Sequence, residues 1–350
     1  MITTLSRLDR LAYHGQHLGL FLQATVLQEV ARLATRSPRP VLGKLELTTL
    51  MNRHRALHQR DLANVEAGLY PRELLFDIPV RAYLRQLPQL VRDTPNVIRR
   101  KRAKDFKDIP VVDRERYPAY YRRTFHWQTD GYFSEHSAEV YELGVELLFR
   151  GTADIMRRQV IPPITRFVRE RGIATDGDTA GAGLRLLDVA CGTGRTLHQL
   201  ARTFPAMALH GVDLSPAYVR TARRRLADVP ELTLAVENGE HLPWADATFD
   251  VVTSTYLFHE LPRNARRNVV RELLRVVKPG GLVVIEDSAQ LSESSEIAPA
   301  LHSFPAEFHE PFYEDYLEDD LAALLTEIGF MAPTTEAHMV AKVVFARRPG

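Results

Sequence analysis

The feature that most constrains the fold of this chain is a short apolar run that leads into a glycine-rich turn and then into a helical pattern. The run covers residues 184–189, the turn residues 190–194 and the helical pattern residues 195–204. Glycine lets a backbone approach a ligand closely because it has no Cβ, and the first turn of a helix offers free N–H groups to an anion. The segment therefore predicts a ligand-binding turn between a strand and a helix.

The alternation of strands and helices continues toward the end of the chain. Short β-rich runs occupy residues 209–212, 232–236, 251–254 and 282–285, with helical patterns between them. Strands that alternate with helices are typical of βαβ units, which build a parallel sheet. We therefore expect an α/β fold in the second half of the chain, after a glycine- and alanine-rich linker at residues 179–183.

The first half of the chain shows helical patterns and no predicted strand. Apolar residues recur at helical spacing in residues 18–33 and 80–91, aromatic residues gather in 117–133, and further helical patterns cover 137–149 and 152–171. This change of pattern divides the chain into three expected regions. They are a helical N-terminal region (residues 1–115), an aromatic-rich helical cap with its linker (residues 116–180) and the α/β domain (residues 181–350).

A dinucleotide is the first alternative ligand for a glycine turn of this kind. Its fingerprint requires a small residue three positions after the second glycine, where this chain has Leu197. Asp188 precedes the turn and would repel a pyrophosphate, but it can accept a hydrogen bond from the ammonium group of an amino-acid ligand. Asp213 ends the second strand beside the turn, where its carboxylate can bind both hydroxyls of a ribose, while Ser215 is the better cap for the next helix.

Five motifs stand in a fixed order over about residues 184–290: DVACGTGR (188–195), GVDLS (211–215), NGEHLPW (238–244), FDVV (249–252) and RVVKPGG (275–281). Together they resemble the class I S-adenosylmethionine-dependent methyltransferases, in the style of the ubiquinone/menaquinone-biosynthesis type (methyltransferase type 11). The resemblance implies S-adenosyl-L-methionine as the cofactor, with Gly192 and Gly194 beside its methionine part, Asp213 on the ribose, and Asn238 and Gly239 flanking the adenine. It adds these residues to the expected cofactor-binding set: Asp188, Ala190, Thr193, Leu214, Glu240 and Thr255.

The same resemblance implies a Rossmann-like, doubly wound α/β sheet of seven strands, preceded by a mainly helical N-terminal region. The last strand is expected to run antiparallel at the sheet edge, and residues 341–347 fit that position. Two residues depart from the family pattern: Ala190 stands where the first motif glycine is usual, and Asn238 stands where aspartate is common. Alanine is still small, and the Asn238 carbonyl can still accept a hydrogen bond from the adenine amino group.

The methyl acceptor is expected outside the carboxyl ends of the strands, where α/β sheets bind ligands. His259 follows the fourth strand and is the first candidate for a general base or an acceptor-orienting group, although a histidine packed against the cofactor explains it equally well. His309 and Glu310 come second, in an aromatic segment that suits a lid or a surface loop over the sheet. We expect no metal, because His302, His309 and Glu310 match no helix-borne ligand spacing.

The acceptor is also expected to contact the aromatic segment. Residues 120–133 carry more rings than a core needs, interleaved with polar residues, which is typical of the wall of a binding site. Alanine in place of Tyr121 or Trp127 should then weaken acceptor or cofactor binding. The full expected acceptor-binding set is Tyr121, His126, Trp127, Tyr256 and Tyr313.

Composition narrows the partners and the location. The 350 residues include 45 basic and 44 acidic side chains, a net charge of +1 that argues against nucleic acid. The chain has one cysteine, no secretory signal at its start and no apolar run long enough for stable membrane insertion, so we expect a cytoplasmic protein. Its N-terminal helices leave self-association into a homo-oligomer open.

These observations predict methyl transfer to a small-molecule acceptor, at carbon or oxygen, with an aromatic or lipid-like acceptor favoured. Two alternatives share the expected fold. One is an NAD(P)-dependent oxidoreductase, which Leu197 and Asp188 disfavour. The other is a non-catalytic, cofactor-binding regulatory protein, because a fold does not determine a function.

Overall fold

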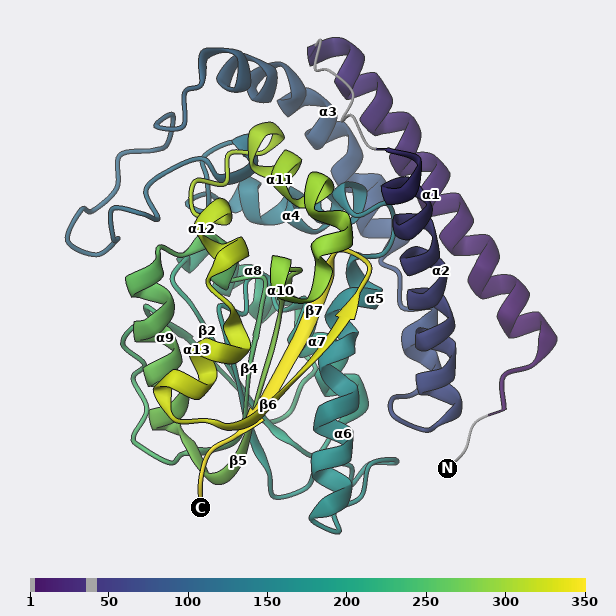
Figure 1. Cartoon of the computed structure of the whole chain (residues 1–350), viewed down its shortest axis with the longest axis vertical. Coiled ribbons are helices and arrows are strands. Elements are labelled where there is room, and N and C mark those ends of the chain that lie inside the picture. The colour runs from purple at the N-terminus through teal and green to yellow at the C-terminus, as the bar shows by residue number, and fades with distance from the viewer. Residues whose placement is uncertain (1–3, 36–42) are drawn as a thin grey trace.

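The computed structural model describes residues 4–35 and 43–350, which form a seven-stranded sheet between layers of helices (Figure 1). The strands are β1 (Arg185–Val189), β2 (Ala208–Asp213), β3 (Leu232–Val236), β4 (Phe249–Thr255), β5 (Val277–Ser288), β6 (Met331–His338) and β7 (Ala341–Arg347). Their order is β3-β2-β1-β4-β5-β7-β6, and β7 runs antiparallel to both of its neighbours, whereas the other pairs are parallel. Because the chain order reverses between β1 and β4, a ligand-binding crevice is expected at their carboxyl ends.

The sequence predicts six of these strands and misses β6. The structure places β6 at the sheet edge and β7 between β5 and β6, so the expectation that β7 is the edge strand is wrong. The side chains of β6 are mostly exposed or half-buried, and the strand contains Pro333. An edge strand leaves part of its backbone unpaired and tolerates proline, so its sequence lacks the apolar run that marks the central strands.

Both faces of the sheet are buried under helices. Leu186 and Leu187, neighbours in β1, belong to two different apolar cores, because successive side chains of a strand point to opposite faces. This double coverage explains the continuous apolar runs that predict the central strands. Figure 1 shows one pair of helices on one side of the sheet and a second pair on the other: α6 (Ile161–Glu170) with α7 (Arg195–Thr203), and α9 (Arg263–Val276) with α13 (Leu321–Ile328).

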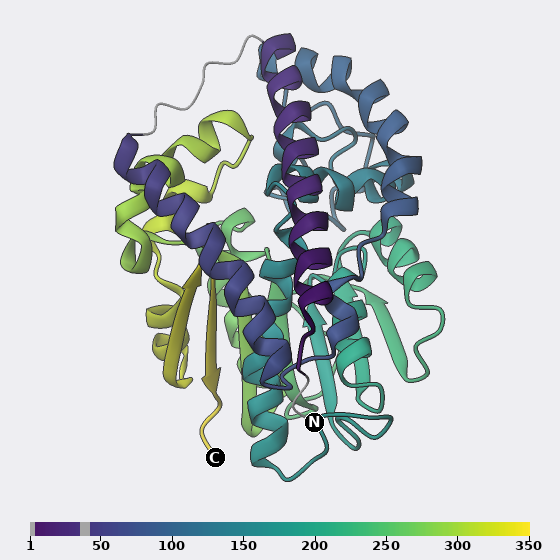
Figure 2. The ribbon, with the colours of Figure 1, turned by 90° about the vertical axis from the view of Figure 1, so that its right-hand side faces the viewer.

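The N-terminal helices pack on the α6 side of the sheet (Figure 2). One apolar core includes Tyr13, Leu57, Ile164 and Leu186, and so joins the first two helices to α6 and β1. The division of the chain at residues 115 and 180 stays a prediction. The helices before α6 are α1 (Arg7–Thr35), α2 (Lys44–Glu66), α3 (Val80–Ala103), α4 (Glu135–Leu148) and α5 (Ala153–Arg157).

The remaining helices are α8 (Pro216–Arg225), which follows β2, and α10 (Leu291–Ser294), α11 (Ala298–Glu307) and α12 (Tyr313–Glu318), which follow β5. Among residues 4–35 and 43–350, no helix has both the length and the apolarity needed to cross a membrane. The expectation of a cytoplasmic location rests partly on the start of the chain. Residues 1–3 of that segment lie outside the described residues.

Candidate active site

The turn after β1 has a left-handed backbone at three positions. The φ angles are +60° at Ala190, +54° at Gly192 and +80° at Gly194. Gly194 is the N-cap residue of α7, and a Cβ there would lie 3.0 Å from a methyl carbon of Leu226. A Cβ at Gly192 would meet nothing within 4 Å, so the turn leaves open space beside this residue.

Ala190→Gly is expected to raise the free energy of unfolding by about 1 kcal/mol. A residue with a Cβ costs roughly 1–2 kcal/mol in the left-handed region, and the greater freedom of glycine in the unfolded chain offsets part of the gain. Urea unfolding measures the change. Ala182→Gly is the control, because Ala182 is exposed and has no left-handed backbone. It should not raise the free energy of unfolding. A loss of stability in Ala190→Gly would contradict the prediction.

Asp213 ends β2 and connects the turn to the next helix. Its Oδ2 accepts a hydrogen bond from the backbone N–H of Gly192 at 3.0 Å, and its Oδ1 accepts one from the N–H of Ser215 at 2.8 Å. Ser215 caps α8, as its sequence position predicts, by accepting from the N–H of Tyr218 at 3.3 Å. Burial raises the pKa of Asp213 to about 6. The sequence suggests that this carboxylate is free for a ligand, but in the structure it has two protein donors. It still borders the cavity described below.

Asp188 lies one strand away and is 1% exposed. Its Oδ1 accepts a hydrogen bond from the Thr253 hydroxyl at 2.9 Å, while its Oδ2 has no hydrogen-bond partner among the described residues. Burial, with a smaller contribution from the nearby carboxylate of Asp213, raises the pKa of Asp188 to about 7. A buried carboxylate oxygen without a donor fits a cofactor that brings a positively charged group to this end of β1.

Asp188→Asn is expected to gain stability relative to the wild type as the pH rises from about 5 to about 8. The pKa of Asp188 rises from 3.8 to about 7 on folding, so its stabilising contribution is complete below about pH 4 and is lost as the pH passes through about 7. The amide removes this dependence. Urea unfolding of both proteins at the two pH values, without ligand, measures the difference between their free energies of unfolding. A difference that does not change with pH would refute the raised pKa of Asp188.

A cavity of about 100 Å³ lies at the carboxyl ends of β1, β2 and β4. Most of the residues expected to bind the cofactor border it, together with two of the expected acceptor-binding residues. These wall residues are Ala190, Gly192, Asp213, Leu214, Asn238, Gly239, Thr255, Tyr121 and Tyr256.

Four expected cofactor-binding residues lie outside the cavity wall, and three of them hold the wall in place. Glu240 accepts hydrogen bonds from the Tyr120 hydroxyl at 2.6 Å and from the Asn268 amide at 2.9 Å. The Thr193 hydroxyl accepts from Arg225 at 2.7 Å, and Gly194 packs against α8. Asp188 is the fourth, behind the turn.

Six tyrosines of the described residues border the cavity, and the sequence predicts only two of them, Tyr121 and Tyr256, as binding residues. Tyr132 donates a hydrogen bond to Glu260 Oε1 at 2.5 Å, and Tyr218 lies within hydrogen-bond distance of Ser137 at 2.9 Å. The wall tyrosines are Tyr120, Tyr121, Tyr132, Tyr141, Tyr218 and Tyr256. Tyr141 and Tyr218 come from helices, where their rings look like ordinary core residues, so only the fold assigns them to the site.

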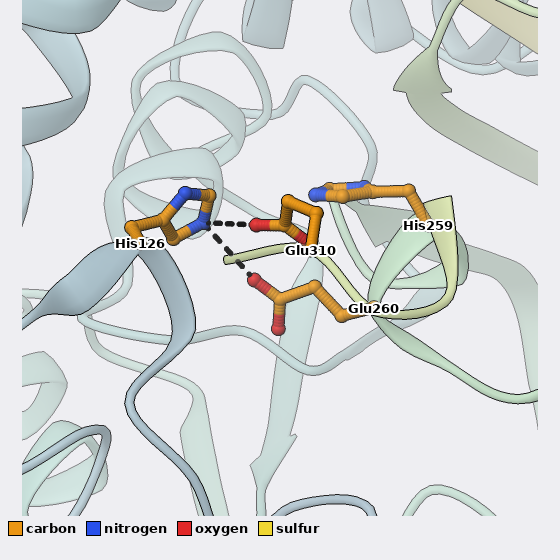
Figure 3. A group of neighbouring side chains, drawn as sticks. All are labelled: His126, His259, Glu260 and Glu310. Carbon is orange, nitrogen blue, oxygen red and sulfur yellow. Dashed lines mark ion pairs between the residues drawn. The ribbon is translucent and has the colours of Figure 1, made fainter. Parts of the chain in front are cut away.

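Four side chains converge beside the cavity, and one of them, Glu260, belongs to its wall. The four are His126, His259, Glu260 and Glu310 (Figure 3). We call them the His–Glu cluster, and one ligand atom from each lies within 4.8 Å of the others. His126 Nε2 lies 3.0 Å from Glu310 Oε1 and 3.4 Å from Glu260 Oε1. The structure thus unites His259 and Glu310, predicted as catalytic candidates, with His126, predicted as an acceptor contact.

Burial and neighbouring charges shift the pKa values of His259 and Glu310 in the His–Glu cluster. Burial lowers the pKa of His259, but the Asp287 carboxylate, 2.6 Å from Nδ1, outweighs it and raises the pKa to about 9. Burial also raises the pKa of Glu310 to about 7. Asp287 itself is held by the N–H groups of Leu257 and Phe258, at 3.0 and 2.7 Å.

Three other predicted residues lie outside both the cavity wall and the cluster. His309 stacks on Phe106, with 4.8 Å between ring centroids, so its side chain diverges from that of Glu310. Trp127 donates its indole N–H to the backbone oxygen of Glu307 at 3.1 Å. The Tyr313 ring packs against His259 at 6.0 Å between centroids. Their placement favours support of the cluster over direct contact with a ligand.

The glycine turn after β1, the acid at the end of β2 and the reversed strand β7 define a Rossmann-like, ligand-binding α/β protein of the class I methyltransferase type. A family model described as a methyltransferase domain matches residues 186–281. A demethylmenaquinone methyltransferase of Tropheryma whipplei is 30% identical over 43% of this chain and 67% of its own length. The chain therefore belongs to the class I S-adenosylmethionine-dependent methyltransferases of the ubiquinone/menaquinone-biosynthesis type.

Other relatives overlap with the chain in part. A malonyl-[acyl-carrier protein] O-methyltransferase of Geobacter sulfurreducens is 34% identical over 42% of this chain and 55% of its own length. The chain thus spans about half the length of that relative. The crystal structure of a SAM-dependent methyltransferase from Aquifex aeolicus, 20% identical, covers 52% of this chain and 87% of its own, with a TM-score of 0.39.

Proposed function

We propose that this protein transfers the methyl group of S-adenosylmethionine to a carbon or oxygen of a small aromatic or lipid-like acceptor. The observation that carries the proposal is the cavity between the Gly192 turn and Asp213, at the point where the strand order reverses. The names of the relatives support it, because they describe methyltransferases that act on demethylmenaquinone and on a malonyl-carrier-protein conjugate.

The residues around the cavity fit this cofactor. Asp213 can accept hydrogen bonds from the ribose hydroxyls, Gly192 leaves room beside the turn, and Asn238 and Gly239 border the same space for the adenine. The unpartnered oxygen of Asp188 suits the positively charged methionine part. A cavity of about 100 Å³ is smaller than the roughly 300–1,000 Å³ of typical ligand pockets, so we expect the tyrosine wall to move outward on binding.

Bound S-adenosylmethionine would supply an electrophilic methyl group on its sulfonium, for direct displacement by the acceptor. The protein mainly positions the two reactants and excludes water. The tyrosine wall provides the apolar, water-poor surface for an aromatic or lipid-like acceptor. The His–Glu cluster borders the same cavity through Glu260 and supplies the polar groups that orient an acceptor oxygen or take up its proton.

Calorimetry distinguishes this function from an oxidoreductase. We expect S-adenosylmethionine and its demethylated product to bind stoichiometrically and NADH not to bind. Incubation with methyl-labelled cofactor and a cell extract then tests for an enzyme, and identification of the labelled product names the acceptor. Binding without any labelled product would support a non-catalytic regulatory protein, and tight NADH binding would refute the methyltransferase.

We also propose that α1 pairs with α1 of a second copy. One face of this helix exposes large apolar side chains at helical spacing, and nothing lies within 4 Å of a Cβ built at Gly15 or Gly19 on the same helix, so a second helix can approach closely. The exposed residues are Leu8, Leu11, Leu18, Leu22, Val26, Val30 and Leu33.

Leu22→Lys with Val26→Lys is expected to convert a dimer into a monomer, because two charges then face each other across a two-fold axis. Light scattering after size-exclusion chromatography measures the mass. Leu84→Lys, at an exposed position of α3, is the matched control and should stay dimeric. A wild type that is monomeric at high concentration would end this proposal.

A further inference from the structure

The His–Glu cluster brings together two imidazoles and two carboxylates from separate parts of the chain. His126 precedes α4, His259 and Glu260 follow β4, and Glu310 lies between α11 and α12. The sequence predicts no metal from the spacing of His302, His309 and Glu310. Of these three residues only Glu310 belongs to the cluster, while His302 forms an exposed pair with Glu314 at 2.9 Å. The convergence is therefore a product of the fold.

One carboxylate of the cluster lacks hydrogen-bond partners among the described residues, and one of its histidines has a strained backbone. Glu310 is 3% exposed, and neither of its carboxylate oxygens has a hydrogen-bond partner among the described residues, although His126 lies close in charge contact. Leaving a buried carboxylate without hydrogen bonds is costly unless a cation compensates it. His126 has a left-handed backbone with φ of +53°, a strained conformation that directs its ring toward both glutamates.

The orientation of His259 completes the pattern of a metal site. Its Nδ1 is held by Asp287, and Figure 3 shows its other ring nitrogen on the side of Glu310. A carboxylate behind a histidine is the usual arrangement that orients a metal-ligating imidazole. Tyr132 holds Glu260 in the same way, through its hydrogen bond to Oε1 at 2.5 Å.

We propose that His126, His259, Glu260 and Glu310 bind one divalent first-row transition metal ion at the acceptor end of the cavity. Two nitrogen and two oxygen ligands suit Zn²⁺, Mn²⁺ or Fe²⁺. Bonds of about 2.0–2.1 Å in a tetrahedral site place ligand atoms roughly 3.3 Å apart, close to the 3.0 and 3.4 Å that separate His126 from the two glutamates. The four ligand atoms lie within 4.8 Å of one another, so the most distant of them must move closer together to complete the site.

The ion deepens the proposed function and rests on it, because Glu260 belongs both to the cluster and to the cavity wall. An ion held by these four residues would take an acceptor oxygen as a fifth ligand and lower its pKa, so that a phenol, enol or hydroxyl would release its proton to water before it receives the methyl group. The substrate class is thus an acceptor with an oxygen at or beside the methylated atom.

The test is metal binding by the full chain after removal of metal with a chelator. After the stripped protein is reloaded with Zn²⁺ and freed of excess ion, we expect one Zn²⁺ per chain by elemental analysis. Titration of the stripped protein with Co²⁺ should give the visible absorption of a nitrogen- and oxygen-ligated ion. Glu310→Gln and His126→Gln each remove one ligand and should weaken Co²⁺ binding at least about 100-fold, while Asp287→Asn should weaken it about 10- to 100-fold by releasing His259.

His302→Gln is the matched control, because this histidine also pairs with a glutamate but lies exposed outside the cluster, and it should bind Co²⁺ like the wild type. Calorimetry with S-adenosylmethionine on every variant shows whether the fold is intact. A wild type that binds the cofactor but no metal overturns the metal site and leaves the proposed function standing. Metal binding that survives in both Glu310→Gln and His126→Gln also overturns it. Metal binding without cofactor binding would instead refute the proposed function.

Discussion

Asp213→Ala is expected to weaken S-adenosylmethionine binding at least about 100-fold. The carboxylate is placed to accept both ribose hydroxyls, and each hydrogen bond to a charged group contributes about 1.5–3 kcal/mol, so the loss of two corresponds to roughly 3 kcal/mol or more. The same substitution removes the acceptor for the N–H groups of Gly192 and Ser215, which loosens the turn itself. Calorimetry with the demethylated cofactor, which cannot react, measures the affinity.

Asp228→Ala is the matched control for Asp213→Ala. It removes the same charge from the loop after α8, at an exposed position outside the cavity wall, and should bind the cofactor like the wild type. Asp213→Asn is the informative intermediate, because its amide oxygen can replace only one of the two acceptor oxygens. An affinity of Asp213→Ala within about threefold of the wild type would show that the cofactor ribose lies elsewhere.

Asp61→Ala is expected to lower the free energy of unfolding by about 3–5 kcal/mol, the usual cost of removing one partner of a buried ion pair. Asp61 is fully buried in α2 and accepts two hydrogen bonds from Arg158, at 2.6 and 2.5 Å. It also accepts from the hydroxyls of Tyr13 at 2.7 Å and Tyr70 at 2.6 Å. Its loss strands the Arg158 guanidinium, which is 3% exposed, in the core that joins the N-terminal helices to the sheet.

A double variant separates the ion pair from the packing around it. Asp61→Leu with Arg158→Met replaces both charges by apolar side chains and should recover most of the lost stability, because no buried charge remains without a partner. Tyr13 keeps His58 as a partner at 3.0 Å, and Tyr70 keeps the backbone oxygen of residue 61 at 3.2 Å. Urea unfolding measures all variants, and a loss below about 1 kcal/mol in Asp61→Ala would contradict the expected cost.

The cofactor side of the candidate site is readable in the sequence because it is local. The turn at residues 190–194 lies within one strand–turn–helix unit, Asp213 is the last residue of the next strand, and Asn238 follows the strand after that. Parallel strands bring their carboxyl ends to one edge of the sheet, so residues after successive strands meet there without further information. Ala190 shows the limit of this argument, since its left-handed backbone appears only in the structure.

The acceptor side is less readable because it depends on contacts between distant segments. His259 and Glu310 stand out as single polar residues near strand ends, but their union with His126 depends on how the segment before α4 crosses the cavity. His309 and Trp127 have equally suggestive positions in the sequence, yet they pack outside the cluster. Residue type and spacing could not separate the two groups.

The sequence by itself determined the α/β architecture, the glycine turn and the acid beside it, since these depend on apolar periodicity and on backbone conformations that glycine adopts most readily. Tertiary structure alone decided the edge position of β6, the Asp61–Arg158 pair and the meeting of two histidines with two glutamates. Those features arise from the packing of segments far apart in the chain, where burial sets the partner of each charge and no local pattern records it.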